Sequence, residues 1–173
     1  MRTFIKNGEG LIPCEKWEPN CWINIENPTE EDKDYLINDL SIPLAYYNDI
    51  EDIDERPRIE VENGWFLVLL RVPIKTLDNS FPFATAPLGI IFKGDVFVSI
   101  SFQPTEMLPD FILYSQRKGI IKKNDFDLVL RLLLSSSVWF LKSLKQINQK
   151  IKLAEKQLEK SIKNEDLQTL LQI

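Results

Sequence analysis

The chain has 173 residues, of which 44% are hydrophobic and 27% charged, a composition typical of a soluble globular protein. Its length predicts one domain, or one domain with an appendage. It contains no histidine, which excludes His-based acid–base catalysis, Ser-His and Cys-His nucleophile pairs and the commonest zinc ligand. Two cysteines, Cys14 and Cys21, are too few for a Cys-based tetrahedral metal site and are typical of reduced thiols in a cytosolic protein.

The formal net charge of −5 conceals an uneven distribution of charge along the chain. Residues 26–62 contain thirteen acidic residues against three basic ones, a balance of −10. Residues 117–163 contain twelve basic residues against four acidic ones, a balance of +8. Such a division indicates lobes that attract different partners, or copies that meet head to tail, unless both segments are simply solvated faces.

A strand and two helices are the first elements expected in chain order. Residues 22–25, WINI, contain strand-forming side chains. Thr29 then supplies an N-cap and Asp32 a capping-box acid for a helix. Pro43 predicts the start of a second, short helix. The residues expected to face inward from that helix are Leu44, Tyr47 and Ile50.

Two β-hairpins are expected next. Residues 58–62 alternate between polar and apolar, and residues 65–72 form a more apolar partner strand. Asn63-Gly64 between them suits a type I′ turn, which needs positive φ at both central positions. Residues 88–102 repeat the pattern, with a turn at residues 93–95. These four strands predict an antiparallel run, which becomes a mixed sheet if the N-terminal strands join it.

The rest of the chain is expected to be helical. A helix from Thr105 ends at Gly119, and Asn124 or Asp125 then caps a much longer helix that runs to about residue 162. Positions 133, 137, 140, 144, 147, 151, 154, 158 and 161 carry seven apolar residues, the 3.5-residue repeat of a coiled-coil-like helix that packs against other helices. Asn164 has the features of a new N-cap, so the last residues predict a truncated second helix.

Neither the long helix nor the N-terminus has the pattern of a membrane or export segment. The longest uncharged part of the helix is residues 132–141, whereas a spanning helix needs roughly 20 mostly apolar residues. Lys6, Glu9 and Glu15 interrupt the N-terminus, where a signal peptide requires an apolar stretch. We therefore expect this polypeptide to be soluble and not secreted.

The sequence contains no Gly-rich phosphate loop, metalloprotease helix or nucleophile elbow, so we expect neither an enzyme nor a catalytic cofactor. Residues 49–57, DIEDIDERP, hold five carboxylates that suit a hard cation, but they lack the glycine and terminal glutamate of an EF-hand and favour a solvated acidic loop. The lysine-rich helix has no aromatic residue beyond Phe140 for base stacking, which argues against nucleic acid as a partner.

Four stretches, in this order, resemble the cytoplasmic N-terminal domain of the CorA family of divalent-cation transporters. They are WINIENPTEEDKDYL (22–36), ERPRIEVENGWFLVLLRVP (55–73), FVSISF (97–102) and RKGIIKKNDFDLVLRLLLSSSVWFLKSLKQINQKI (117–151). The resemblance implies an α/β fold: an α/β/α layered domain with a mixed, largely antiparallel sheet over residues 1–120. A long, coiled-coil-like helical region follows over residues 121–173 and stops before the family's stalk and its two membrane helices with their Gly-Met-Asn motif.

By this resemblance the chain is the cytoplasmic regulatory, cation-sensing part of a CorA-type magnesium and cobalt ion transport protein. The resemblance further implies assembly as a homo-oligomer, a pentamer for the full-length protein. It implies a position on the cytoplasmic side of the inner membrane, reached through the region C-terminal to this chain. The ions that it implies are Mg²⁺, with Co²⁺ or Zn²⁺ as alternatives, and they are regulatory or transported rather than catalytic.

The resemblance also implies a metal-binding residue. The acidic residue that follows the second hairpin strand in the family aligns with Asp78 in KTLDNS, which makes Asp78 the expected ligand of a regulatory divalent cation. Asp78-Asn79 equally suits an ordinary turn. Because the long helix is basic where helices that concentrate cations are expected to be acidic, a ZntB-like zinc transporter is an alternative. A soluble helical scaffold without transport is the other.

Overall fold

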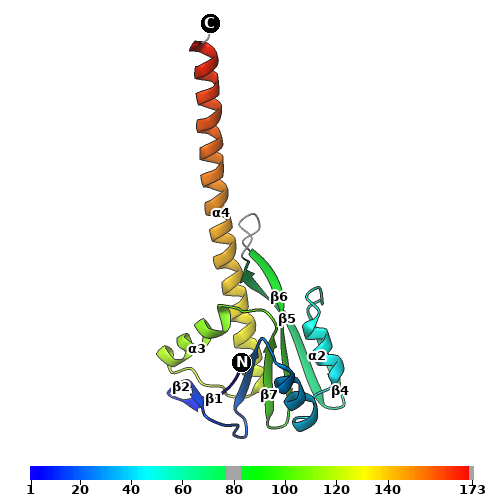
Figure 1. The fold of residues 1–173 in the computed structure, drawn as a ribbon. Coiled ribbons are helices and arrows are strands. Elements are labelled where there is room, and N and C mark those ends of the chain that lie inside the picture. Colours follow the sequence, from blue (N-terminus) through cyan, green and yellow to red (C-terminus); the bar gives the residue numbers. More distant parts are fainter. Residues whose placement is uncertain (77–82, 172–173) are drawn as a thin grey trace. The chain divides into compact units, whose positions relative to one another are not determined.

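The computed structural model describes the backbone of residues 1–76 and 83–171 and the side chains of residues 1–76 and 83–163 (Figure 1). By its internal contacts the chain divides into an N-terminal unit, Met1–Trp139, and a C-terminal unit, Phe140–Ile173. The boundary expected from the sequence lies between residues 120 and 121. The contacts instead keep the first turns of the last helix with the N-terminal unit, because those turns contribute side chains to its core.

The N-terminal unit is built on one seven-stranded sheet with the order β2-β1-β3-β7-β6-β5-β4. The strands are β1 (Arg2–Gly8), β2 (Gly10–Cys14), β3 (Trp22–Glu26), β4 (Arg58–Glu62), β5 (Trp65–Lys75), β6 (Phe83–Lys93) and β7 (Val96–Ser101). Neighbouring strands are antiparallel except β3 and β7, which are parallel. The predicted mixed, largely antiparallel sheet is therefore confirmed.

Helices cover both faces of this sheet. The helices are α1 (Glu30–Asp34), the π-helical turn η1 (Tyr35–Asp39), α2 (Leu44–Glu51), α3 (Met107–Lys118) and α4 (Asp125–Leu171). Because successive strand residues point to opposite faces, two separate apolar cores form. One contains buried residues of η1 and α2, and the other contains buried residues of α3 and the start of α4. The α/β/α layers are thus confirmed.

Short-range capping and turn chemistry decides several boundaries as the sequence predicted. The Thr29 Oγ1 accepts a hydrogen bond from the Asp32 backbone N–H at 3.2 Å, and the Asp32 carboxylate accepts one from the Thr29 N–H at 3.1 Å, which completes the capping box. Asn63 and Gly64 have φ of 51° and 80°, as a type I′ hairpin requires. Gly119 ends α3 in the left-handed conformation, with φ of 61°.

Two details of the N-terminal half differ from expectation. Pro43 is the N-cap of α2 rather than its first residue. Tyr46 joins Tyr47 and Ile50 in the core, whereas Leu44 is 48% exposed, so its predicted inward position is wrong. The sequence does not delimit strands β1 and β2, because residues 2–14 show neither regular alternation nor a continuous apolar run.

Helix α4 is continuous over 47 residues. The Asn124 side chain accepts a hydrogen bond from the Asp127 N–H at 2.9 Å and so caps its start. The prediction of a separate second helix that begins at Asn164 is wrong, because the backbone of α4 remains helical to Leu171. The physical reason is that residues 125–171 contain no glycine or proline, and an N-cap residue alone does not interrupt a helix that is already propagating.

Candidate regulatory site and exposed surfaces

The residue predicted to bind a regulatory cation, Asp78, lies outside the described residues. What the structure describes is the pair of strand ends that flank it. Lys75 at the end of β5 pairs with Phe83 at the start of β6. The Lys75 Nζ lies 3.0 Å from a Glu106 carboxylate oxygen, and both side chains are more than half exposed. Through this ion pair, the described end of β5 lies close to the start of α3.

The acidic segment after α2 is organised by an arginine of the adjacent strand. The Arg58 guanidinium lies 2.5 Å from Asp49, 2.6 Å from Glu55 and 3.2 Å from Glu60, measured to the carboxylate oxygens. Burial lowers the pKa of Arg58, but the hydrogen bond to Glu60 and the charges of the other two carboxylates outweigh it and raise that pKa above its ordinary value. The three acids thus surround the Arg58 guanidinium, which stays positively charged at every physiological pH.

A second arginine fastens the same segment to the sheet. The Arg71 Nη1 donates hydrogen bonds to the backbone carbonyls of Ile53 and Glu55, at 2.9 and 3.0 Å. Its Nε and Nη2 donate to the hydroxyl and carbonyl oxygens of Thr85, at 2.8 and 2.7 Å. The expectation of a freely solvated acidic loop therefore holds only in part. The sequence feature that could have predicted this attachment is an arginine on each of two neighbouring strands.

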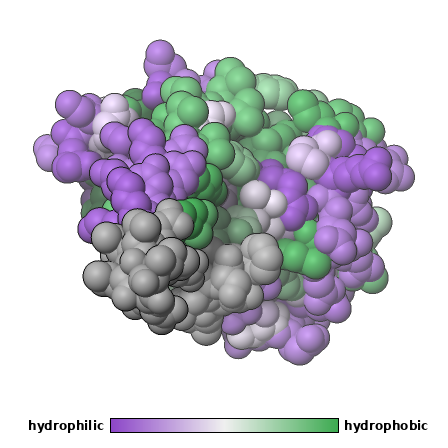
Figure 2. All heavy atoms as spheres, turned by 90° about the horizontal axis from the view of Figure 1, so that it is seen from above, coloured by the Kyte–Doolittle hydropathy of each residue, from purple (hydrophilic) through white to green (hydrophobic). Residues whose placement is uncertain are grey.

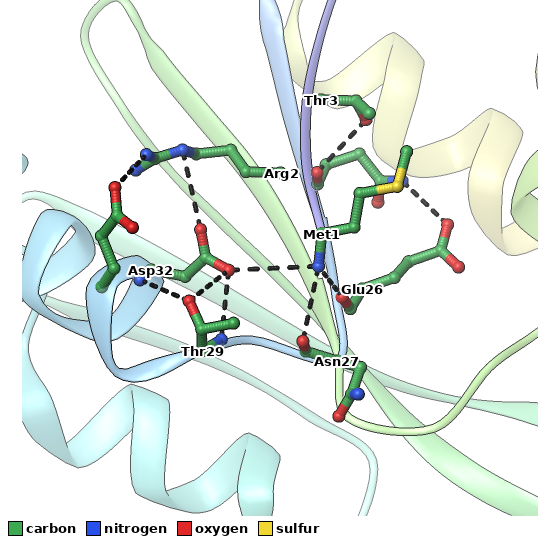
Figure 3. A network of polar contacts seen from close by, with 9 residues as sticks. Met1, Arg2, Thr3, Glu26, Asn27, Thr29 and Asp32 are labelled. Carbon is green, nitrogen blue, oxygen red and sulfur yellow. Dashed lines mark hydrogen bonds and ion pairs between the residues drawn. The ribbon is translucent and has the colours of Figure 1, made fainter.

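A buried carboxylate near the N-terminus has a structural role (Figure 3). Asp32 is 5% exposed and caps α1 together with Thr29. Its two oxygens lie 4.0 Å from the Met1 ammonium and 3.6 Å from the Arg2 Nε, and the Met1 ammonium also donates a hydrogen bond to the Glu26 carbonyl. Two cations thus neutralise this carboxylate and join α1 to β1.

The start of α4 is anchored by a buried lysine. Lys122 is 9% exposed, and its Nζ lies 2.6 Å from Asp125 and 4.8 Å from the centre of the Phe97 ring. Its backbone N–H donates to the Asn7 Oδ1 at 2.9 Å, and its carbonyl accepts from the Asn7 Nδ2 at 2.8 Å. Strand β1 therefore positions the residues that lead into α4.

Neither cysteine has the character of a thiolate ligand. Cys14 and Cys21 carry free thiols, and burial raises the pKa of both above the ordinary thiol value. Within residues 1–76 and 83–163, no cluster of three or more His, Cys, Asp and Glu side chains is arranged to hold a metal ion. The described helices also include none long and apolar enough to cross a membrane.

A large apolar surface of the N-terminal unit is uncovered. Leu128, Val129 and Leu132 point from α4 into the core, but the side chains that lie around the other faces of these turns are exposed. They are Phe126 (56%), Leu130 (64%), Leu133 (44%), Leu134 (66%) and Val138 (43%). On the edge strand β4, Ile59 and Val61 are 73% and 58% exposed. In the view of Figure 2, hydrophobic surface gathers mainly along the upper edge. A contiguous apolar surface is typical of a docking surface.

The C-terminal unit, taken by itself, is an amphipathic helix. With 3.6 residues per turn, most of its apolar residues form one stripe. These are Phe140, Leu144, Ile147, Ile151, Leu158 and Ile162. Leu144, Ile151 and Leu158, which belong to the predicted repeat, are each at least half exposed, and so is Ile162, which was not part of it. The stripe therefore has no partner within this unit's described side chains. A helix with such a stripe is suited to pack against another helix.

Comparison with known proteins places these features in a family. The model of the CorA-like Mg²⁺ transporter protein family matches residues 17–173. No protein with curated annotation matches. The complete structure of the CorA magnesium transporter from Methanocaldococcus jannaschii is similar to this chain with a TM-score of 0.75 and 15% identity, over 91% of this chain and 51% of that one.

Two structures of separate domains are also similar. The soluble domain of the same Methanocaldococcus jannaschii CorA gives a TM-score of 0.70 at 16% identity, over 90% of this chain and 64% of that one. The ZntB cytoplasmic domain from Vibrio parahaemolyticus gives 0.64 at 15% identity, over 86% and 62%. The chain thus spans about half the length of the complete CorA structure and less than two thirds of either domain structure. Because the family model covers nearly the whole sequence, this chain belongs to the CorA-like Mg²⁺ transporter protein family.

Proposed function

We propose that this chain is the cytoplasmic regulatory, cation-sensing domain of a CorA-type ion transport protein with Mg²⁺, and also Co²⁺, as its ions. The observation that carries the proposal is the family match over residues 17–173 together with a fold similar to the CorA magnesium transporter over 91% of this chain. The domain lies on the cytoplasmic side of the inner membrane and works in a homo-oligomer, a pentamer in the full-length protein.

The exposed surfaces support a domain that works in an assembly. An apolar area that includes Ile59, Leu130 and Leu134, each more than 60% exposed, is costly to leave in water and favours association with other helices. The exposed apolar stripe of residues 140–162 likewise favours association with other helices. In this proposal the long helix packs in a coiled-coil-like manner against helices of the same assembly.

Asp78 is the proposed ligand of the regulatory cation. Mg²⁺ retains several of its waters and usually binds through only one or two carboxylates, so a single exposed acid binds it weakly. A second acid from another segment or another copy completes such a site. Binding then links the two segments, and the expected consequence is that divalent cations favour association.

The test is the molar mass of the purified 173-residue chain, measured by sedimentation velocity while MgCl₂ is raised to about 10⁻³ M and above. Mg²⁺ is expected to raise the mass, and chelation with EDTA to reverse the rise. Asp78→Asn removes the charged ligand and is expected to abolish the response. Asp95→Asn, in the turn between β6 and β7, is the matched control and should respond like the parent chain. An equal response of both variants would refute the role of Asp78.

A ZntB-like zinc transporter is the second candidate, favoured by the TM-score of 0.64 with a ZntB cytoplasmic domain and by the basic long helix. The same titration with Zn²⁺ and Co²⁺ separates the two candidates, and ion uptake by cells that express the complete reading frame identifies the transported ion. The third candidate, a helical scaffold, predicts no ion uptake and a mass that is indifferent to every divalent cation.

A further inference from the structure

The lysines of the C-terminal unit gather on one face of the helix. Of the seven lysines in residues 142–163, six lie within a sector of about 80° when projected at 100° per residue. These six are Lys142, Lys145, Lys152, Lys156, Lys160 and Lys163. The sector is centred about 150° from the apolar stripe, so the helix has an apolar face and a basic face. From Lys145 to Lys163 the basic face extends for roughly 27 Å.

The basic face is accessible along its length, since each of its six lysines is exposed. The only acids of residues 142–163, Glu155 and Glu159, lie beside this face rather than on it. A row of like charges on one helix raises the local potential and repels itself. An anionic surface that faced the row would relieve that repulsion, while the apolar stripe remained open to another helix.

The N-terminal unit carries a surface of the opposite sign. Residues 26–62 contribute eight exposed carboxylates from α1, η1, α2, the segment after α2 and β4. They are Glu30, Glu31, Asp34, Asp39, Glu51, Asp52, Asp54 and Glu62. In the same residues, Arg58 is occupied by its three carboxylates, Lys33 is half-buried, and Arg56 is the one exposed base. Outside this range, Arg2 pairs with Glu31 at 3.8 Å, and the acidic surface keeps a large excess of negative charge.

We propose that the basic face of residues 142–163 of one copy docks on the acidic surface of residues 30–62 of a second copy of this chain. The inference rests on the proposed assembly of copies and names the surfaces through which they meet. Because the two surfaces are different, each single contact is head-to-tail, and its repetition around an axis closes a ring if the rotation between neighbouring copies divides the full circle evenly. Charge complementarity of this kind selects the partner and its orientation more than it adds affinity.

A charge-exchange experiment tests the proposal. One variant carries Lys145→Glu, Lys152→Glu and Lys156→Glu. A second carries Glu51→Lys, Asp54→Lys and Glu62→Lys, three exposed acids for which no hydrogen bond or ion pair of the side chain is found. Self-association of each variant, and of the two mixed, is measured by sedimentation velocity at about 0.01 M and 0.15 M salt, where the Debye length is about 30 and 8 Å.

Each variant alone is expected to weaken self-association about tenfold or more, because three attractive pairs become repulsive. A chain that carries all six substitutions is expected to associate within about threefold of the parent chain. The matched control is Lys16→Glu, Lys118→Glu and Lys123→Glu, which makes the same change in net charge on exposed lysines of the N-terminal unit and should leave association unchanged. Circular dichroism of every variant confirms that it has folded.

Three outcomes overturn the proposal, and they differ in what they say of the proposed function. If the parent chain associates but neither triple variant differs from the control, the assembly stands and these surfaces are wrong. If the six-fold variant fails to recover, the two surfaces do not face each other. If the chain stays a single copy at both salt concentrations and instead binds anionic lipid vesicles through the same three lysines, the basic face serves a membrane surface and not a second copy.

Discussion

Gly89→Ala tests how α2 packs on the sheet. Gly89 lies in β6, where it is opposite Leu69 on one side and Ile100 on the other. The Cβ of an alanine at this position would lie 2.1 Å from the Ile50 Cδ1 and 2.3 Å from its Cγ1, far closer than any ordinary contact. Gly89 is not among the residues with positive φ, so its backbone conformation accepts alanine. Any loss of stability therefore reports the collision with Ile50.

The expected loss is about 1–3 kcal/mol of unfolding free energy, the usual cost of an overpacked core. Ile50 cannot give way easily, because it is 1% exposed and surrounded by its core. Displacement of α2 also moves Asp49, whose carboxylate lies 2.5 Å from Arg58, so the acidic segment is expected to loosen as well. The assay is urea unfolding followed by circular dichroism and tryptophan fluorescence, with the free energy extrapolated to water.

A double-mutant cycle makes the interpretation refutable. Ile50→Ala alone removes buried methyl groups and is expected to cost about 2–5 kcal/mol. In Gly89→Ala/Ile50→Ala the new methyl group occupies space that Ile50 has vacated, so the double variant should be more stable than the sum of the two losses implies, by about 0.5–3 kcal/mol. Strict additivity of the two losses would refute direct contact between α2 and Gly89.

The remaining predictions concern three other local interactions. Asn7→Ala leaves the backbone N–H and C=O of Lys122 without their side-chain partner. It is expected to lower the unfolding free energy, measured in urea, by about 1–3 kcal/mol. An unchanged urea midpoint of unfolding would contradict this prediction. The hydrogen bond from Arg131 lowers the pKa of Asp127. The stability that Asp127 contributes is therefore present above the ordinary carboxyl pKa and is lost as pH falls through the lowered value. Asp127→Asn should flatten this part of the profile of unfolding free energy against pH, and an unaltered profile would exclude the linkage. Gly64→Ala places a side chain at φ of 80° and is expected to lower the unfolding free energy by about 1 kcal/mol. Gly8→Ala serves as the comparison, because φ is not positive there and the new methyl group meets only the flexible Ile12 side chain.

The parts of the fold that follow from neighbouring residues could be predicted. Thr29 and Asp32 are three residues apart and satisfy each other's backbone, and Asn63-Gly64 decides its turn within two residues. The apolar repeat of the long helix likewise depends only on spacing along one element. In each case the energy that selects the conformation comes from atoms close in sequence, so one sequence contains enough information.

Features that depend on distant residues could not be predicted in this way. The parallel pairing of β3 with β7 joins residues about 75 positions apart, and nothing in WINIE identifies VFVSIS as its neighbour. The three carboxylates around Arg58 come from a helix, a loop and a strand. Of the candidate site, Asp78 came from a family resemblance and stays a prediction. The basic face of α4, by contrast, follows from projecting Lys142–Lys163 onto a helix and was within reach of the sequence.

The parallel pairing of β3 and β7 has a consequence for the synthesis of the chain. Strand β3 is buried on both faces and hydrogen-bonds to β1 and β7. A ribosome that adds about 5–20 residues per second needs on the order of 4–15 s to proceed from the end of β3 to the end of β7. During that interval the apolar residues Trp22, Ile23 and Ile25 lack β7 as a neighbour and part of the buried surface that covers them in the finished cores. We therefore expect the nascent N-terminal segment to be prone to aggregation, and codon changes that slow translation of residues 27–101 should increase aggregation of the newly made protein.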